Sequence, residues 1–144
     1  MAIDGKTLRH SFDRAAAKAA IHMVSAWANS NRLVLGQVKV DDKSNEITAI
    51  PQLLKMLDLT GATVTIDAMG CQKEIAKVLS EQGADYVLAL KKNHRTLYDE
   101  VTLFLDDARA NEFAEIDHAY HETVEGDHGR IEIRQYWITS EIDW

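Results

Sequence analysis

The stretch of residues 63–70 constrains the fold more than any other part of the sequence. Val64 and Ile66 alternate with threonines, which is typical of a short strand, and residues 72–82 then carry apolar side chains at helical spacing. The pattern places Asp67 at the carboxyl end of a strand that leads into a helix, where open α/β sheets bind their ligands. A carboxylate in this place serves either as a metal ligand or as a residue that caps the turn.

The composition is that of one soluble domain with a surplus of acidic residues. The chain has 144 residues, 46% hydrophobic and 27% charged, and 16 Lys and Arg stand against 23 Asp and Glu for a net charge of −7. This balance excludes a protein that grips DNA by bulk electrostatics, so contact with nucleic acid must rest on local basic clusters or on other parts of the protein. The single cysteine and the lack of a signal peptide or membrane-spanning run predict a cytoplasmic protein that does not bind membranes.

Apolar periodicity and turn signals predict an order of short strands and helices. We expect strands at 2–5, 21–28, 33–40, 63–67 and 86–90, helices at 47–57, 72–82 and 96–108, and two last strands at 116–124 and 131–138. Ser44 or Asn45 can cap the first helix. Pro51 is tolerable there only near the first turn, because deeper in the helix it removes a hydrogen bond. The last helix should bury a stripe of Leu97, Val101, Phe104 and Leu105.

This order predicts an α/β fold of the ribonuclease H-like type: a mixed five-stranded sheet flanked by helices, with an additional C-terminal β-hairpin. A hairpin directly after the first strand makes the first three strands antiparallel, and the helix–strand units that follow add parallel strands. If the first strand and the Asp67 strand are parallel neighbours, Asp4 and Asp67 lie side by side. The chain starts inside an apolar run and stops without a polar tail, so we expect a piece of a longer protein.

Two aspartates at neighbouring strand ends favour a divalent cation, because their charges otherwise repel. Hard oxygen ligands with open positions select Mg²⁺ or Mn²⁺. A pair of such ions ~3.5–4 Å apart can activate an attacking oxygen and stabilise the leaving oxygen of a phosphodiester. The same pair of carboxylates also fits a phosphatase, a receiver domain or a structural metal site, so the residues alone leave these alternatives open.

Several runs together resemble the bacterial insertion-sequence transposases of the H-repeat-associated (ISAs-type) branch of the DDE superfamily. The resemblance covers essentially the whole chain, and the runs that carry it are AIDGKTLR at 2–9, VKV at 38–40 with KSNEI at 43–47, TIDAMGCQ at 65–72, DYVLALKKN at 85–93 and HGRIE at 128–132. It implies a ribonuclease H-like fold and metal-dependent cleavage and strand transfer of insertion-sequence DNA, with two ions of Mg²⁺ or Mn²⁺ in the complete protein.

The resemblance implies catalytic roles for Asp4 and Asp67, as the first and second acid of the site. The third acid of this family is expected in a helix with a His-Trp-Gly-Ile-Glu-Asn type motif, which the sequence lacks. Glu132 could replace it, but it lies in a strand of the hairpin that this superfamily inserts before its last catalytic helix. We therefore expect residues 1–111 to form part of the catalytic core and 112–144 a hairpin insertion, with the third acid beyond Trp144 and the fragment inactive alone.

Glu46 opens the first helix and is a further candidate metal ligand, since an acid of this helix can join the site in ribonuclease H-like enzymes. The interpretation that we favour is that Glu46 is a partner of the helix dipole. Basic residues near strand ends could contact DNA phosphates or stand in solvated loops, and Arg130 and Arg134 could instead pair with Glu132. The candidate DNA contacts are Lys6, Arg9, Lys91, Lys92, Arg95, His128 and Arg130. The histidines are too scattered to form a zinc site.

The leading interpretation is that the chain is the catalytic core of a DDE transposase. Its expected partners are insertion-sequence ends, target DNA and a second copy of the chain in a homodimer, and no small-molecule cofactor is expected. The alternative is a non-catalytic remnant of a mobile element that binds DNA or a partner through the same fold. A phosphatase or receiver domain would use a Lys after the last strand, which Lys91 partly satisfies, but the early hairpin does not fit. The sequence does not identify the target DNA.

Overall fold

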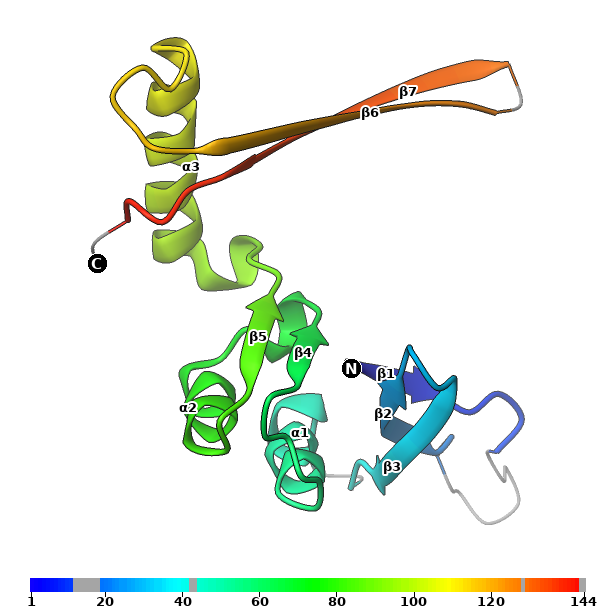
Figure 1. Ribbon diagram of the computed structural model, residues 1–144. Coiled ribbons are helices and arrows are strands. Elements are labelled where there is room, and N and C mark those ends of the chain that lie inside the picture. The colour runs from blue at the N-terminus through cyan, green and yellow to red at the C-terminus, as the bar shows by residue number, and fades with distance from the viewer. Residues whose placement is uncertain (12–18, 42–43, 128, 143–144) are drawn as a thin grey trace. The chain divides into compact units, whose positions relative to one another are not determined.

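The computed structural model describes residues 1–11, 19–41, 44–127 and 129–142, and the chain forms two compact units (Figure 1). The first unit comprises Met1–Arg95 and the second Thr96–Trp144. Among the described residues, none of the helices combines the length and the hydrophobicity of a membrane span. The expected functional boundary at residue 111 stays a prediction; by packing, the last long helix belongs with the hairpin.

The first unit is built on a five-stranded mixed sheet in the order β3-β2-β1-β4-β5. Its strands are β1 (Ala2–Thr7), β2 (His22–Ala28), β3 (Leu33–Lys39), β4 (Thr63–Ile66) and β5 (Asp85–Leu88). β1 pairs antiparallel with β2, and β2 with β3, whereas β4 pairs parallel with both β1 and β5. This order confirms the predicted ribonuclease H-like sheet.

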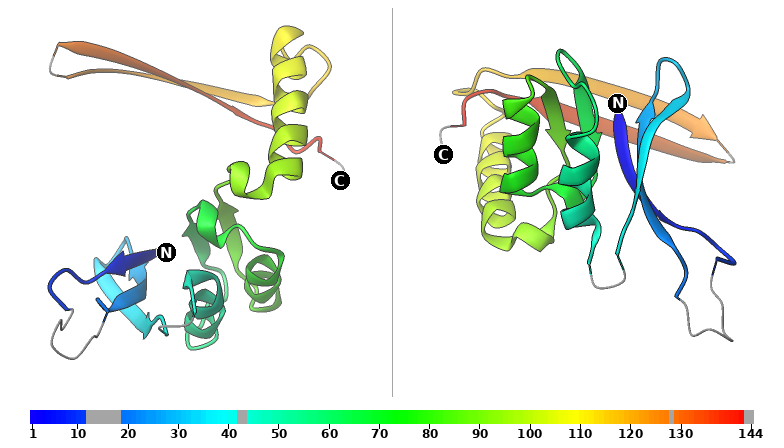
Figure 2. Two further views of the ribbon diagram at one scale, coloured as in Figure 1. Left: turned by 180° about the vertical axis from the view of Figure 1, so that it is seen from behind. Right: turned by 90° about the horizontal axis from the view of Figure 1, so that it is seen from below.

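Two helices pack on one face of this sheet, as the views in Figures 1 and 2 show: α1 (Glu46–Leu54) and α2 (Lys73–Glu81). Asn45 caps α1, because its side chain accepts a hydrogen bond from the Thr48 backbone N–H at 3.3 Å. The apolar stripes of both helices meet alternate residues of the strands, and the largest fully buried side chains are Ile50, Leu53, Leu54, Leu59, Ile75, Leu79, Val24 and Val64.

Pro51 lies inside α1 rather than near its first turn, so the expectation for this residue was wrong. A proline in a helix interior costs about 3 kcal/mol or more, because it removes one hydrogen bond and crowds the preceding turn. The helix nevertheless continues through Leu53 and Leu54, both of which are 0% exposed. Full burial of such side chains contributes about 1.5–3 kcal/mol each, enough to offset the loss.

The second unit consists of the helix α3 (Arg95–Ala110), whose first residue belongs to the first unit, and a hairpin of β6 (Ala119–Asp127) and β7 (Arg130–Ile138). Phe113 is buried and stacks on Trp137 with ring centroids 5.6 Å apart, and the Arg109 guanidinium lies 5.6 Å from the Trp137 ring. These contacts join α3 to the hairpin. The expected buried stripe of α3 is only half-buried, and Leu97 is exposed, since the unit offers it little apolar surface.

A small polar network crosses the hairpin between Tyr120, Glu122 and Gln135. The Tyr120 hydroxyl donates to Glu122 Oε2 at 2.6 Å, and Gln135 Nε2 donates to the same oxygen at 2.9 Å. The hydrogen bond from Tyr120, and then that from Gln135, lowers the pKa of Glu122 below its usual 4.5. The bond to Glu122 in turn raises the pKa of Tyr120 above its usual 10.0.

The network predicts a pH window for the hairpin. Glu122 has a lowered pKa, so it contributes stability above pH 4.5, and this stability is lost as the pH falls through the pKa of Glu122 in the folded protein. Tyr120 has a raised pKa, so it contributes stability below pH 10.0, and this stability is lost as the pH rises through the pKa of Tyr120 in the folded protein. Glu122→Gln should return the pKa of Tyr120 toward 10.0 in an ultraviolet titration of tyrosinate, with Tyr120→Phe to assign the signal.

Glu125→Gln is the matched control, because Glu125 lies on the same strand but pairs with Arg134 instead. It should leave the titration of Tyr120 unchanged. An unchanged titration in Glu122→Gln as well would show that this network does not exist in solution.

Candidate active site

The parallel pairing of β1 with β4 places Asp4 and Asp67 next to each other in the register. Ala2 pairs with Thr65 and Ile3 pairs with Ile66, so the next positions along the two strands are the two aspartates. Ile3 and Ile66 are buried on the side of the helices, and side chains alternate along a strand. Asp4 and Asp67, which are both exposed, therefore share the face away from α1 and α2, as the strand order predicted.

Asp67 also caps the turn that follows β4. Its backbone is extended, with φ −69° and ψ −179°, and its Oδ1 accepts the Met69 backbone N–H at 3.0 Å at the start of the short helix η1 (Ala68–Gly70). This hydrogen bond fixes the direction of the carboxylate and uses one lone pair of one oxygen. The second oxygen is left for another ligand, so both roles considered for Asp67 are compatible.

The η1 turn is held tightly from two sides. Gly70 is buried, and a Cβ at this position would overlap the side chain of Ile66, so only glycine permits the close approach. From the other side, Asn93 Nδ2 donates to the Ala68 backbone carbonyl at 2.7 Å. Asn93 belongs to the short helix η2 (Lys92–His94) after β5. The sequence did not indicate this role, because Asn93 lies in a run of basic residues that predicts contacts with phosphate.

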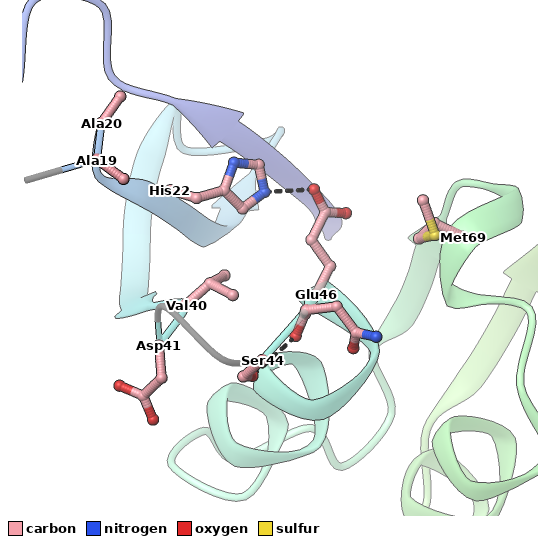
Figure 3. Close-up of a pocket in the computed structure, with 9 residues that line it drawn as sticks. Ala19, Ala20, His22, Val40, Asp41, Ser44, Glu46 and Met69 are labelled. Atoms are coloured by element: carbon pink, nitrogen blue, oxygen red, sulfur yellow. Dashed lines mark hydrogen bonds and ion pairs between the residues drawn. The ribbon is translucent and has the colours of Figure 1, made fainter. Parts of the chain in front are cut away.

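Glu46 lies on the opposite side of β1 from Asp4. A Cβ on Gly5 would overlap the Glu46 carboxylate, which therefore sits on the helix-covered face. Its Oε1 is 2.5 Å from His22 Nε2, and His22 Nδ1 is 2.8 Å from Thr7 Oγ1. Figure 3 shows this pair on the wall of a hollow of about 340 Å³ that Met69 also lines. The structure thus engages Glu46 with His22, a residue that the sequence did not indicate.

Glu132 belongs to the second unit, where two arginines hold it. Arg134 Nη2 donates to Glu132 Oε2 at 2.5 Å, Arg130 donates to Oε1, and Arg134 also reaches Glu125 at 3.0 Å. The expected alternative of ion pairs between these arginines and Glu132 is confirmed. The roles of Glu132 as third acid and of Arg130 as a DNA contact stay predictions.

The remaining basic candidates lie in the first unit or outside the described residues. Lys6 alternates with Gly5 and so shares the face of Asp4, and Lys91 and Lys92 follow β5 at the edge of the sheet where Asp67 follows β4. Arg9 is exposed in the segment after β1. Lys92 and Arg95 have interactions of their own within the structure. His128 falls outside the described residues.

The donor set fits part of a magnesium or manganese site. Asp4 and Asp67 offer hard carboxylate oxygens from one face of two adjacent strands, the ligand type that these ions prefer. Within the part of the chain that the structure describes, no three residues among His, Cys, Asp and Glu are grouped so that they could hold a metal ion. The structure therefore places Asp4 and Asp67 next to each other on one face of the sheet, and it places Glu46 on the opposite face.

Comparison with known proteins relates nearly the whole chain to one protein family. Residues 1–140 match the family model described as a transposase DDE domain. The chain is 49% identical over 144 residues to an uncharacterized protein of the dhlA 3' region of Xanthobacter autotrophicus, covering 100% of this chain and 47% of that protein.

Two relatives from Escherichia coli K12 carry transposase names. The chain is 48% identical over 138 residues to the "H repeat-associated putative transposase YhhI", covering 96% of this chain and 36% of the relative. It is 49% identical over 140 residues to the "Putative transposase YncI", covering 97% and 55%. The chain thus spans between about a third and just over half of these relatives. None of the solved structures matches it.

The geometry predicts a weak divalent-metal site that depends on Asp67. A ligand that binds only the folded state stabilises it by RT ln(1 + [L]/Kd), about 2.7 kcal/mol at a hundred times Kd. Because two carboxylates make an incomplete site, we expect a small rise in Tm that needs millimolar Mn²⁺ or Mg²⁺. Asp67→Asn, which can still cap the turn, should reduce this rise and slightly raise the Tm of the metal-free protein by relieving repulsion.

Asp58→Asn provides the matched control for these thermal melts. Asp58 Oδ1 accepts the Thr60 backbone N–H at 3.1 Å, which is the same turn geometry, but Asp58 precedes β4 whereas Asp67 follows it. Its metal-induced shift should equal that of the wild type. Identical shifts in all three proteins would mean that the ion binds elsewhere on the acidic surface.

Proposed function

The chain belongs to the family of transposases with a DDE domain, and on that premise we propose that Asp4 and Asp67 are the first two acids of a metal-dependent site for DNA strand cleavage and strand transfer. The proposed substrates are the ends of an insertion sequence and a target DNA. The proposed cofactor is Mg²⁺ or Mn²⁺, held by Asp4 and Asp67. In the complete protein a pair of such ions would activate the attacking oxygen and stabilise the leaving oxygen of a phosphodiester.

One observation carries this proposal: the register in which Ile3 pairs with Ile66, so that the two aspartates follow on the same face of adjacent parallel strands. This register brings two carboxylates from distant parts of the sequence to neighbouring positions. The Met69 N–H then fixes the direction of the Asp67 carboxylate before any ligand arrives. Preorganised charges of this kind account for most of the catalysis of phosphoryl transfer.

Binding of DNA is proposed to rest on local basic residues, since the net charge of the chain is −7. Lys6 on the face of Asp4, and Lys91 after β5, are placed to contact phosphates on either side of the aspartates. Arg9, Lys92, Arg95 and Arg130 are further candidates. A change of any one of these residues should weaken binding uniformly across DNA sequences, because phosphate contacts carry no sequence information.

A second candidate function is that of a non-catalytic remnant that binds DNA or a partner through the same fold. The observation in its favour is that the described residues do not group a third metal ligand with Asp4 and Asp67. The two candidates differ in whether phosphodiester bonds break, so one assay separates them.

The assay is cleavage and strand transfer by the complete gene product on DNA that carries the element's ends, with Mn²⁺. Asp4→Asn and Asp67→Asn should each lower the rate on the order of a hundredfold or more, because each removes a carboxylate that would hold the metal ion. Asp58→Asn should retain the wild-type rate. Binding without cleavage by the wild type would instead support the remnant, and activity that survives both active-site substitutions would contradict the proposed site.

The 144-residue chain alone is expected to be inactive in the same assay. Robust strand transfer by this chain that Glu132→Ala abolishes would identify Glu132 as the third acid.

A further inference from the structure

The position of the Asp67 carboxylate depends on the η1 turn that follows it. Its Oδ1 is bound to the Met69 N–H, so a movement of the η1 turn would carry the carboxylate with it. Two backbone hydrogen bonds close the turn itself: Gly70 N–H to the Asp67 carbonyl spans 3.1 Å, and Cys71 N–H to the Ala68 carbonyl spans 3.3 Å. Hydrogen-bond geometry is poorer in a 3-10 turn than in an α-helix, so a contact from outside can add to the stability of this turn.

Asn93 supplies that support. Its side-chain amide donates to the Ala68 carbonyl at 2.7 Å, a shorter bond than either of those within the turn, and the contact is partly buried. Of the two ends of the Asn93 amide, only the NH₂ group can donate to a carbonyl, so the orientation of the amide follows from its partner. The bond joins the segment after β5 to the segment after β4, beyond the last backbone bond between them, from Ala89 N–H to the Ile66 carbonyl at 3.2 Å.

We infer that Asn93 is a positioning residue for the metal ligand Asp67: it holds the Ala68–Gly70 turn, and through the Met69 N–H it fixes the direction in which the Asp67 carboxylate meets a divalent cation. The inference rests on the proposed function, since it requires that Asp67 binds the ion. Partners that orient metal ligands from outside the coordination sphere typically change metal affinity 10–100-fold when they are removed.

The test is the Kd of the 144-residue chain for Mn²⁺, measured from the electron paramagnetic resonance signal of the free ion. Asn93→Ala removes the donor without adding charge, and should raise the Kd about tenfold or more. Asn93→Gln keeps an amide that can donate, and should restore the Kd to within about threefold of the wild type, a rescue that loss of stability alone would not produce.

Thr139→Val is the matched control. The Thr139 hydroxyl also donates to a backbone carbonyl, that of Asp117, at 2.8 Å, but it lies in the second unit. Its loss should leave the Kd unchanged. Circular dichroism of each variant checks that it is folded.

A measurement on the wild type covers the case in which Asn93→Ala does not fold. The side-chain NH₂ resonances of Asn93 should shift on titration with Mg²⁺, with the same midpoint as the Met69 amide, and should stay in place in Asp67→Asn. Resonances of Asn93 that do not respond to Mg²⁺ in the wild type would overturn the inference.

The arms of the experiment also separate this inference from the proposed function. If Asp67→Asn weakens Mn²⁺ binding and Asn93→Ala does not, the positioning role is wrong and the metal site stands. If Asp67→Asn binds Mn²⁺ as the wild type does, the metal site is wrong, and the role of Asn93 fails with it.

Discussion

The parallel pairing of β1 with β4 is the constraint on which the first unit depends. It is short, with two register pairs extended by a hydrogen bond from the Thr65 N–H to the Met1 carbonyl at 2.8 Å. It joins the antiparallel hairpin half of the sheet to the parallel half, and it sets the face of each side chain on both strands. A slip of one residue would turn Asp4 or Asp67 toward the helices, where a carboxylate would have to be buried.

Much of this arrangement follows from local sequence patterns. Alternation in residues 63–66 predicts β4, and the hydrophobic spacing of 72–82 predicts α2 to within a residue at each end. The cap at Asn45 and the early hairpin were likewise predictable, because turn chemistry and side-chain period act over a few residues. The adjacency of Asp4 and Asp67 was predicted on the condition that the first strand and the Asp67 strand are parallel neighbours, and the structure shows this pairing.

The parts that were missed depend on contacts between distant residues. Asn93 reaches the Ala68 carbonyl across 25 positions of sequence, and His22 reaches Glu46 across 24, and neither bond has a local signature. Pro51 was misplaced because its cost is local whereas the burial of Leu53 and Leu54 that offsets it is tertiary. The α3 stripe has the right period, but periodicity does not reveal how much apolar surface is present to cover it.

The central claim is that Asp4 and Asp67 meet at one cation, and paramagnetic broadening tests it most directly. Traces of Mn²⁺ added to the isotope-labelled chain should first broaden the backbone amide signals of Gly5, Ala68 and Met69, since broadening falls steeply with distance from the ion. The amides near the acidic pair Asp106 and Asp107 of α3 should stay sharp at the same Mn²⁺ concentration. Broadening centred on α3, with the signals around both Asp4 and Asp67 unaffected, would contradict the account.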